Sequence, residues 1–411
     1  MEVICMSRQK LQERLKMKHV ETKHGEQFND LLRYVFQVTN HQLQTFGWEN
    51  REIEQAKLPV LKQADVLGWF DGDKLISQLA VYPFQVNIFG QRYEMGGLTG
   101  VGTYPEYANL GLMNQLMRQA LTNMRERKQS ISYLYPYSIP YYRRKGWEII
   151  SDKISFEVKD TQLPKLKTVS GNVERMSIEH PDIKDVYQRF ALQNHGAMLR
   201  NDLAWEENLR WDLDDLTAAV YYDGDHQPMG YLLYWIAGEV FHMKEMVFIN
   251  QEARTGLWNF ISAHFSMITH VKGHIYTDEP LAFLLEDGDI KETIAPYYMA
   301  RIVDLSLFLE KYPFQPQETD CQLTFTLHDP MLEWNQGTFT LMVDEEGKGH
   351  LTGGGVNPAA AFDIQTLTTM LMGYKRPSYL ARIERFRADE VTVNLLEKLI
   401  IRQQPYFSDY F

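Results

Sequence analysis

The sequence predicts a mixed α/β protein of the α+β kind, built from more than one domain. With 411 residues, the chain exceeds the roughly 250 to 300 residues that one hydrophobic core supports. Hydrophobic residues make up 44% and charged residues 23% of it, close to average globular usage. Strand patterns joined by Asp-Gly turns are followed by helical periodicity twice along the chain. We therefore expect two or three domains, each combining a sheet with helices.

The composition argues against nucleic-acid, membrane and metal partners. The formal net charge is −12, so the surface as a whole repels phosphate backbones and anionic membranes and attracts cationic amines. The two cysteines, Cys5 and Cys321, are too few for a disulfide framework, and the histidines lack the spacing of a metal site. No apolar run approaches the roughly 18 residues that span a bilayer. We therefore expect a soluble, cytoplasmic protein that uses no metal.

The first predicted domain covers residues 17–165 and follows a charged extension at 1–16. Apolar residues at intervals of three and four predict an amphipathic helix over 26–40. A hairpin is expected at Asp71-Gly72-Asp73, because glycine tolerates the positive φ of a tight turn. The other elements expected here are strands at 85–89, 92–103, 131–135 and 147–158, and helices at 111–124 and 140–145.

The second predicted domain, 166–297, repeats this order. The segment Tyr221-Tyr222-Asp223-Gly224-Asp225 is similar to the first hairpin turn, and strands at 231–236 and 240–248 precede a helix at 253–267. We interpret this as a divergent internal repeat. The last domain, 298–411, is expected to be a small α+β unit, with strands at 323–327 and 338–343 and helices at 363–372 and 391–402.

The segment 100–113 carries the first functional signal. A strand ends there, the backbone turns and a helix begins, and the unpaired N–H groups of a helix start form an anion site. Gly111 has no side chain to block a close ligand, so a diphosphate could lie on these amides. An ordinary strand-to-helix turn has the same pattern, and this segment alone favours that interpretation.

A second segment favours a ligand site. The spacing Ser-x-x-x-Tyr-x-x-x-Gly-aromatic is present as Ser138, Tyr142, Gly146 and Trp147. Together the two segments resemble the GNAT acyltransferases, and more narrowly the Eis (enhanced intracellular survival) family of N-acetyltransferases. The resemblance extends over residues 17–411. It implies tandem GNAT folds, the second without a cofactor site, followed by a sterol-carrier-protein-like domain, and it implies a homo-oligomer, a hexamer.

The resemblance also implies roles for particular residues. Tyr142 corresponds to the family's general acid, and the terminal carboxylate of Phe411 to its general base. An amine must lose a proton before it attacks, and the departing CoA thiolate must gain one, so a phenol and a carboxylate suffice. The residues implied to bind acetyl-CoA are Val101, Gly102 and Thr103 at the thioester, Asn109, Leu110, Gly111, Leu112, Met113 and Asn114 at the diphosphate, and Tyr137 and Ser138 at the pantetheine.

One departure from the family pattern bears on cofactor binding. The usual Arg/Gln-x-x-Gly-x-Gly/Ala loop reads Ala108-Asn109-Leu110-Gly111-Leu112-Met113 and lacks its basic residue. Losing one charge-assisted hydrogen bond weakens binding by about 10- to 150-fold unless another cation compensates. The sequence thus predicts transfer of an acetyl group to the primary amine of a cationic small molecule or a lysine side chain. The alternative is a weakened or inactive protein that binds an apolar ligand in its carrier-like domain.

Overall fold

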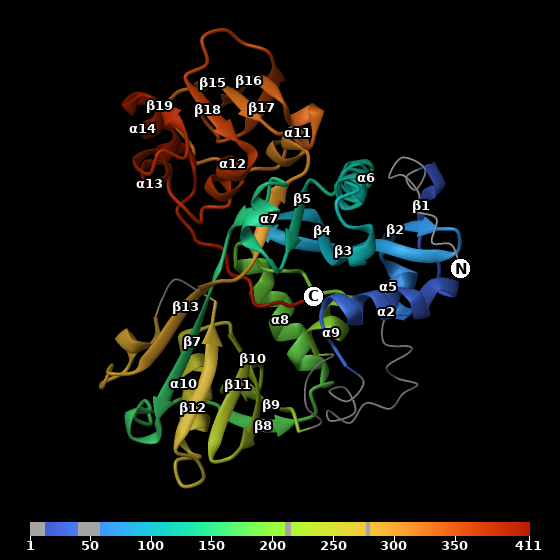
Figure 1. The fold of residues 1–411 in the computed structure, drawn as a ribbon. Helices are drawn as coiled ribbons and strands as arrows, with labels where there is room; N and C mark the ends of the chain where they lie inside the picture. Colours follow the sequence, from blue (N-terminus) through green and yellow to red (C-terminus); the bar gives the residue numbers. More distant parts are fainter. Residues whose placement is uncertain (1–12, 40–57, 210–214, 277–279) are drawn as a thin grey trace, which may run out of the picture.

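A computed structural model describes residues 13–39, 58–209, 215–276 and 280–411. The first sheet is mixed, and its outer strand begins inside the extension expected at 1–16, of which residues 1–12 lie outside the described part. Amphipathic helices cover both faces of this sheet, α2 (Gly25–Val35) on one and α6 (Leu112–Glu126) on the other (Figure 1). In spatial order its strands are β1 (Leu15–His19), β2 (Asp65–Asp71), β3 (Lys74–Ile88), β4 (Gln91–Thr103), β5 (Ile131–Leu134), β14 (Met299–Ile302) and β6 (Glu148–Ile149).

The two larger sheets exchange strands. The strand expected at 147–158 is divided: β6 stays in the first sheet, whereas β7 (Asp152–Lys159) pairs with two strands of the second. In return β14, which follows the second domain, inserts between β5 and β6. The domain boundaries expected at 165 and 297 remain predictions, but the second sheet includes β7, which precedes residue 165, and the first sheet includes β14, which follows residue 297. The exchange ties the first two domains together through main-chain hydrogen bonds.

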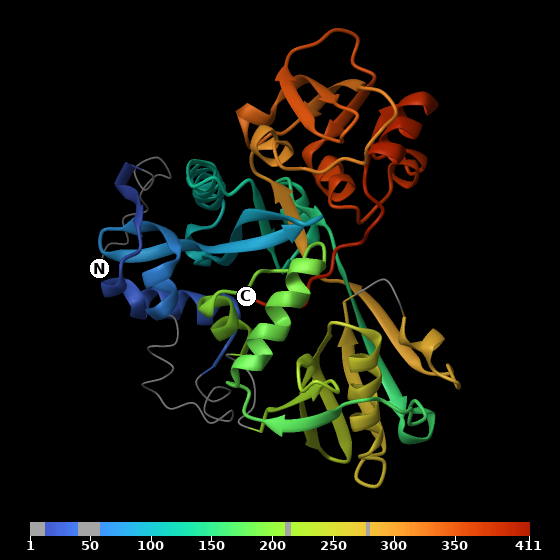
Figure 2. The same cartoon turned by 180° about the vertical axis from the view of Figure 1, so that it is seen from behind.

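The second sheet has the repeated architecture expected from the sequence. Successive side chains of β9 (Thr217–Tyr222) point to opposite faces of this sheet. Tyr221 packs against α10 (Gln251–Ser262) on one face, and Val220 packs against α8 (Pro181–Gln193) on the other. Figure 2 shows α8 standing between the two sheets. The strand order is β13 (Lys291–Pro296), β7, β12 (His270–Ile275), β11 (Val240–Phe248), β10 (Pro228–Ala237), β9 and β8 (Asn172–Met176).

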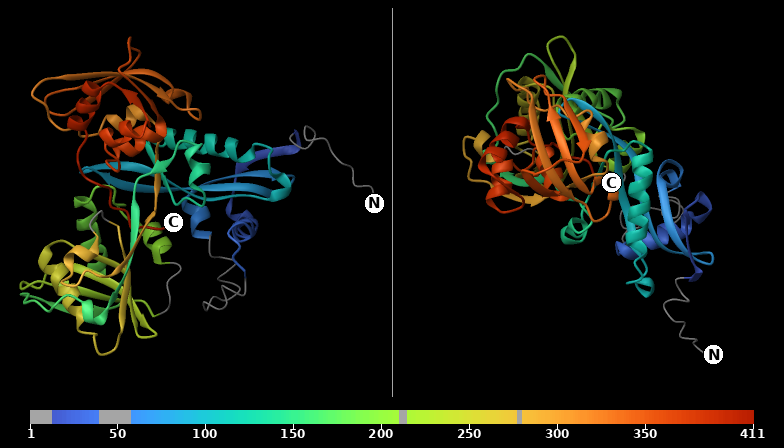
Figure 3. Two further views of the ribbon diagram at one scale, coloured as in Figure 1. Left: turned by 60° about the vertical axis from the view of Figure 1, so that its left-hand side comes forward. Right: turned by 90° about the horizontal axis from the view of Figure 1, so that it is seen from above.

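The C-terminal domain is the α+β unit predicted. It lies on the opposite side of the first sheet from the second domain (Figure 3). Buried Arg301 of β14 donates two hydrogen bonds to Asp329, at 2.7 and 2.5 Å, and so fastens this domain to the first sheet. Its strands are β17 (Gly349–Gly353), β16 (Gly337–Val343), β15 (Cys321–His328), β18 (Ala360–Asp363) and β19 (Arg387–Ala388), with α11 (Leu305–Leu309), α12 (Ile364–Leu371), α13 (Pro377–Arg382) and α14 (Glu390–Leu399).

His195 joins all three domains. Its Nδ1 accepts the Phe89 N–H at 3.1 Å, its Nε2 lies 2.8 Å from the Met372 carbonyl, and its ring stacks on Phe89 at 3.6 Å. Burial lowers the pKa of His195 from 6.5 to about 4. The native state therefore holds this ring neutral at pH values where the unfolded chain protonates it. Stability due to His195 is complete above its ordinary pKa and is lost as pH falls toward the folded value.

We expect the free energy of unfolding to fall between about pH 7 and pH 5, with a share of about 2 kcal/mol from His195. His195→Gln preserves an acceptor and a donor but does not titrate. The free energy of unfolding of this variant should therefore fall by about 2 kcal/mol less than that of the wild type over the same pH interval. Urea unfolding of both proteins at the two pH values measures the difference. Equal losses would contradict this assignment.

Candidate active site

The central strands of the first sheet separate to open a cavity. Parallel strands β4 and β5 are paired only from Met95 to Gly97, opposite Ile131 to Tyr133. Past Gly97 they diverge, and a cavity of about 1240 Å³ is lined by β4 residues 98–101 on one side and by residues that follow β5 on the other. A parallel sheet that opens in this way exposes main-chain groups of both strands to a ligand.

A bulge in β4 lies at the mouth of this opening. Gln78 pairs with Gly102 and Ala80 with Thr99, so Gly100 and Val101 together oppose one residue of β3. Gly100 has a φ of 63°, a conformation that glycine adopts without strain. A bulge takes residues out of the ladder and re-aims them. Gly100 and Val101 line the cavity accordingly.

The three residues predicted at the thioester are therefore split. Val101 lines the cavity, but a Cβ on Gly102 would lie 3.0 Å from Val35, so this residue packs beneath α2. The Thr103 hydroxyl is 2.7 Å from the Ser77 hydroxyl. Neither Gly102 nor Thr103 belongs to the cavity lining.

The residues predicted at the diphosphate form the start of α6, outside that lining. Asn109 and Gly111 have positive φ, 62° and 76°, and turn the chain into the helix. No atom lies within 4 Å of a Cβ built on Gly111, so this side is open. Leu110 and Leu112 are buried, whereas the first-turn N–H groups, from Leu112 to Asn114, have no acceptor within the helix. This open amide cluster suits the oxygens of a diphosphate.

Lys145 approaches the same helix start. It donates a hydrogen bond to the side-chain carbonyl of Asn114, and its Nζ lies 5.3 Å from the centre of the Tyr141 ring. Among the residues the structure describes, no carboxylate lies within ion-pair distance of it. Burial first, then Arg144 and Arg118, lower the pKa of Lys145. Arg143 pairs with Glu148, whereas Lys145 extends toward α6.

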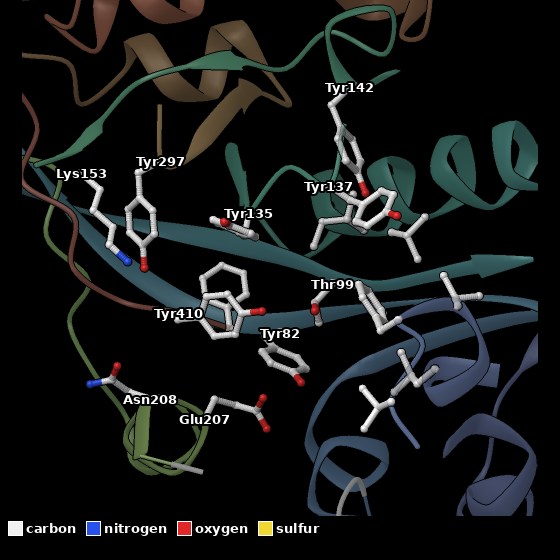
Figure 4. A pocket seen from close by; sticks show the side chains of 18 of the residues that line it. Tyr82, Thr99, Tyr135, Tyr137, Tyr142, Lys153, Glu207, Asn208, Tyr297 and Tyr410 are labelled. Carbon is white, nitrogen blue, oxygen red and sulfur yellow. The ribbon is translucent and has the colours of Figure 1, made fainter. Parts of the chain in front are cut away.

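Tyr142 lies in the short helix α7 (Ile139–Arg143), where only 7% of it is exposed. Its ring meets those of Tyr141 and Trp147 edge to face, at 5.2 and 6.2 Å. Burial, and to a smaller extent Tyr141, raise the pKa of the Tyr142 hydroxyl, so it stays protonated at neutral pH. Tyr137 and Ser138 line the cavity beside it (Figure 4).

The last residue of the chain lines the same cavity as Tyr142. From α14 the tail runs back to the middle of the molecule (Figure 1), where the Phe411 N–H donates to the Tyr298 hydroxyl at 3.1 Å. A Cβ on Gly97 would lie 2.9 Å from the Phe411 ring, so this glycine makes room for it. Aromatic rings surround that of Phe411, at centroid distances of 5.1 Å for Phe84, 5.3 Å for Tyr298, 6.0 Å for Tyr82 and 6.5 Å for Phe407.

A buried ion cluster fixes the tail, and no local pattern in the sequence predicts it. Arg200, with no exposed side-chain surface, donates to Asp409 at 2.6 Å and to Glu245 at 2.6 and 3.1 Å. Ser408 donates to Glu245 at 3.0 Å. These residues come from three distant segments, so neither periodicity nor spacing connects them. Asp409 is two residues before Phe411, and the cluster therefore holds the segment that ends at Phe411 in place.

Replacing Arg200 with methionine should lower the free energy of unfolding by about 3 to 5 kcal/mol, because both carboxylates lose their buried partner. Lys184 forms an exposed pair with Asp202, so Lys184→Met should cost less than about 1 kcal/mol. Urea unfolding of the two variants tests the contrast. Comparable, small losses would mean that the cluster does not hold the tail.

Two further findings concern ions and membranes. Within the described ranges, no group of three or more histidine, cysteine, aspartate or glutamate residues is arranged to hold a metal. In the same part of the chain, no helix combines the length and apolar character needed to cross a bilayer.

Family models match three consecutive parts of the chain. Residues 16–150 and 196–302 each match an acetyltransferase (GNAT) domain, and residues 305–408 match a sterol carrier protein domain. No curated protein sequence is significantly similar to this chain.

Solved structures share the whole architecture. A protein of unknown function from Enterococcus faecalis, described as a probable N-acyltransferase, is 29% identical, with a TM-score of 0.88 over 97% of this chain and 100% of that one. A GCN5-related N-acetyltransferase from Anabaena variabilis is 23% identical over the same shares, with a TM-score of 0.83. Eis1 from Mycobacterium abscessus is 17% identical, again over 97% and 100%, with a TM-score of 0.78. The chain thus has two acetyltransferase (GNAT) domains followed by a sterol carrier protein domain and shares the fold of Eis1, and it is an acyl-CoA-dependent N-acyltransferase of the GNAT family.

Proposed function

We propose that this protein transfers an acetyl group from acetyl-CoA directly to a primary amine, with both substrates bound at once. The observation that carries the proposal is that Tyr142 and the terminal residue Phe411 line one cavity, at the opening between β4 and β5. A phenol and a carboxylate are the two groups that this reaction requires. Acetyl-CoA supplies the activated acyl group, and the protein supplies position and proton transfer.

The fit of acetyl-CoA to the chain is supported by two features. The open amides at the start of α6 suit the diphosphate, and the groove between Val101 and Ser138 suits the pantetheine arm and thioester. Main-chain N–H groups at the β4 bulge would stabilise the negative charge that develops on the thioester oxygen. Asn109, Leu110, Met113 and Asn114 would contribute through their backbone.

In the proposed mechanism, the Phe411 carboxylate accepts a proton from the ammonium form of the substrate. The free amine attacks the thioester carbonyl, and as the tetrahedral intermediate collapses Tyr142 donates a proton to the departing thiolate. The second proton of the attacking nitrogen then returns to the Tyr142 oxygen, and the proton held by the carboxylate leaves to solvent. Burial raises the pKa of Tyr142, but it raises that of the leaving thiol as well, since the same apolar surroundings disfavour both anions. Amide and free CoA are the products.

Lys145 compensates for the basic residue missing at Ala108 in this proposal. Lys145→Ala should raise the KM for acetyl-CoA by about 10- to 100-fold, because a charge-assisted contact with the diphosphate is lost. The KM for S-acetylpantetheine, which has no diphosphate, should change little. Steady-state kinetics with both donors measures the difference, and Lys145→Arg should restore most of the affinity.

Two further variants control this experiment. Lys291 lies on edge strand β13 and is exposed, so Lys291→Ala should leave both KM values unchanged. Ala108→Arg introduced into Lys145→Ala should recover binding of acetyl-CoA. Equal effects of Lys145→Ala on the two donors would contradict a contact with the diphosphate.

Release of free thiol from acetyl-CoA over a panel of primary amines tests the proposed reaction. The net charge of −12 attracts ammonium groups, so small cationic amines and lysine side chains belong in the panel. We expect amine-dependent release of CoA and formation of the corresponding amide. If no amine stimulates thiol release and acetyl-CoA does not bind, the protein acts as a ligand-binding protein instead.

A further inference from the structure

The end of the cavity farthest from Tyr142 is basic. Lys153 of β7, His274 of β12 and Lys244 of β11 line it from three consecutive strands of the second sheet. Figure 4 shows Lys153 and Tyr297 at one end of the cavity and Tyr142 at the other. Cavity-lining lysines need a counter-charge or a ligand to offset the loss of water around them.

Lys153 is the side chain best placed to meet a ligand. Its Nζ lies 5.6 Å from the centre of the Tyr297 ring, and among the described residues no carboxylate lies within ion-pair distance. Burial first, then the charge of Lys244, lower the pKa of Lys153. Lys244 donates to the Asn208 carbonyl at 2.8 Å. An anion beside Lys153 would offset the free-energy cost of burying its charge.

His274 adds a neutral polar group to this end. Burial, followed by the charge of Lys153, lowers the pKa of His274 to about 4. Its Nδ1 lies 3.1 Å from the Ser155 hydroxyl. The ring therefore contributes no positive charge near neutral pH.

Among the residues that the structure describes, the carboxylates near this end are hydrogen-bonded to other groups or belong to the other part of the cavity. Glu245 is held by Arg200, Tyr231 and Ser408, and Asp152 accepts from the Tyr374 hydroxyl at 2.9 Å. Glu207 of α9 (Asp202–Leu209) lines the cavity nearer the chain terminus: burial, Tyr135 and Glu207, in that order, raise the pKa of the Tyr410 hydroxyl. Among the described residues, the far end thus carries the uncompensated positive charge of Lys153, while Glu207 lies toward the chain terminus.

From this polarity we infer that Lys153 anchors an anionic group at the distal end of the acceptor, so that the preferred acceptors are amines with a carboxylate or phosphate at the other end of the molecule. This inference rests on the proposed function. It narrows the acceptors expected from net charge alone, because a polyamine would place an ammonium group against Lys153. Free amino acids, ω-amino acids and aminoalkyl phosphates have the required chemistry.

Amines that differ only in their distal group test the inference. In a thiol-release assay, 5-aminopentanoate should exceed both 5-aminopentan-1-ol and 1,5-diaminopentane in kcat/KM by about 10- to 100-fold, the value of a charge-assisted contact. The corresponding aminoalkyl phosphate distinguishes a phosphate site from a carboxylate site. If the diamine is the best acceptor, or the three amines are equal, the inference is wrong while the proposed function stands.

Variants of Lys153 identify the anchor. Lys153→Met should abolish the preference for 5-aminopentanoate, mainly through KM, and leave the activity with 5-aminopentan-1-ol within about threefold. Lys153→Arg should retain the preference, and Lys291→Met, on exposed β13, should behave as wild type. A preference that survives in Lys153→Met would overturn the assignment.

A binding measurement separates this inference from the proposed function. Without acetyl-CoA, 5-aminopentanoate should raise the thermal midpoint of the wild type but not that of Lys153→Met. If it does so although no amine is acetylated, the anion site exists and the proposed reaction fails. If it binds neither protein, the site is refuted whatever the activity.

Discussion

Replacing Tyr142 with phenylalanine should lower kcat for acetyl transfer by about 10²- to 10⁴-fold, the usual contribution of a general acid. The KM for acetyl-CoA should stay within about threefold, because the ring and its edge-to-face contacts with Tyr141 and Trp147 remain. Only the proton donor to the CoA thiolate is removed. Thiol-release kinetics with a saturating amine measures the change.

Tyr141 provides the matched control. It lies next to Tyr142, lines the same cavity and also carries a phenol. Tyr141→Phe should keep most of the activity, since only Tyr142 is assigned the proton transfer. Full activity in Tyr142→Phe would show that water or another group protonates the thiolate.

Extending the chain by two residues past Phe411 should also lower kcat by about 10²- to 10⁴-fold, because the terminal carboxylate becomes a peptide carbonyl and loses its basicity. The Phe411 ring can stay between Phe84 and Tyr298, so the thermal midpoint should change little. The extended protein still has one terminal carboxylate, but two residues farther along the chain. A loss of activity would therefore be due to the position of the carboxylate and not to a change in net charge.

The same two residues added at the N-terminus serve as the control for this extension and should leave kcat unchanged. An unchanged kcat in the C-terminally extended protein would remove Phe411 from the mechanism. Glu207, which lines the cavity near Tyr410, would then be the next carboxylate to test.

The elements of the fold could be predicted where the pattern is local. The helical spacing that predicted 111–124 corresponds to α6, Leu112–Glu126, and the strand expected at 338–343 corresponds to β16, Gly337–Val343. The exchange of β7 and β14 could not be predicted, because alternation identifies a strand but not the sheet that it joins. The helix expected at 26–40 ends at Val35 in the described residues, and residue 40 lies outside them.

The residues of the site, too, could be predicted where they belong to a local sequence pattern and not where they meet through long-range packing. Val101, Ser138 and Tyr142 belong to two short segments, and each lines the predicted cavity. The contact of Lys145 with Asn114, 31 residues earlier, was not evident, because spacing along the chain does not reveal which side chains meet. The Arg200 cluster and Lys153 depend on packing between domains, and sequence patterns carry no information on such packing.

A crystal structure of the protein with acetyl-CoA tests the central claim most directly. We predict that the diphosphate lies on the main-chain amides at the start of α6, within reach of Lys145, and that the thioester lies between the Tyr142 hydroxyl and the Phe411 carboxylate. An empty groove at millimolar acetyl-CoA, or a thioester out of reach of both groups, would contradict it.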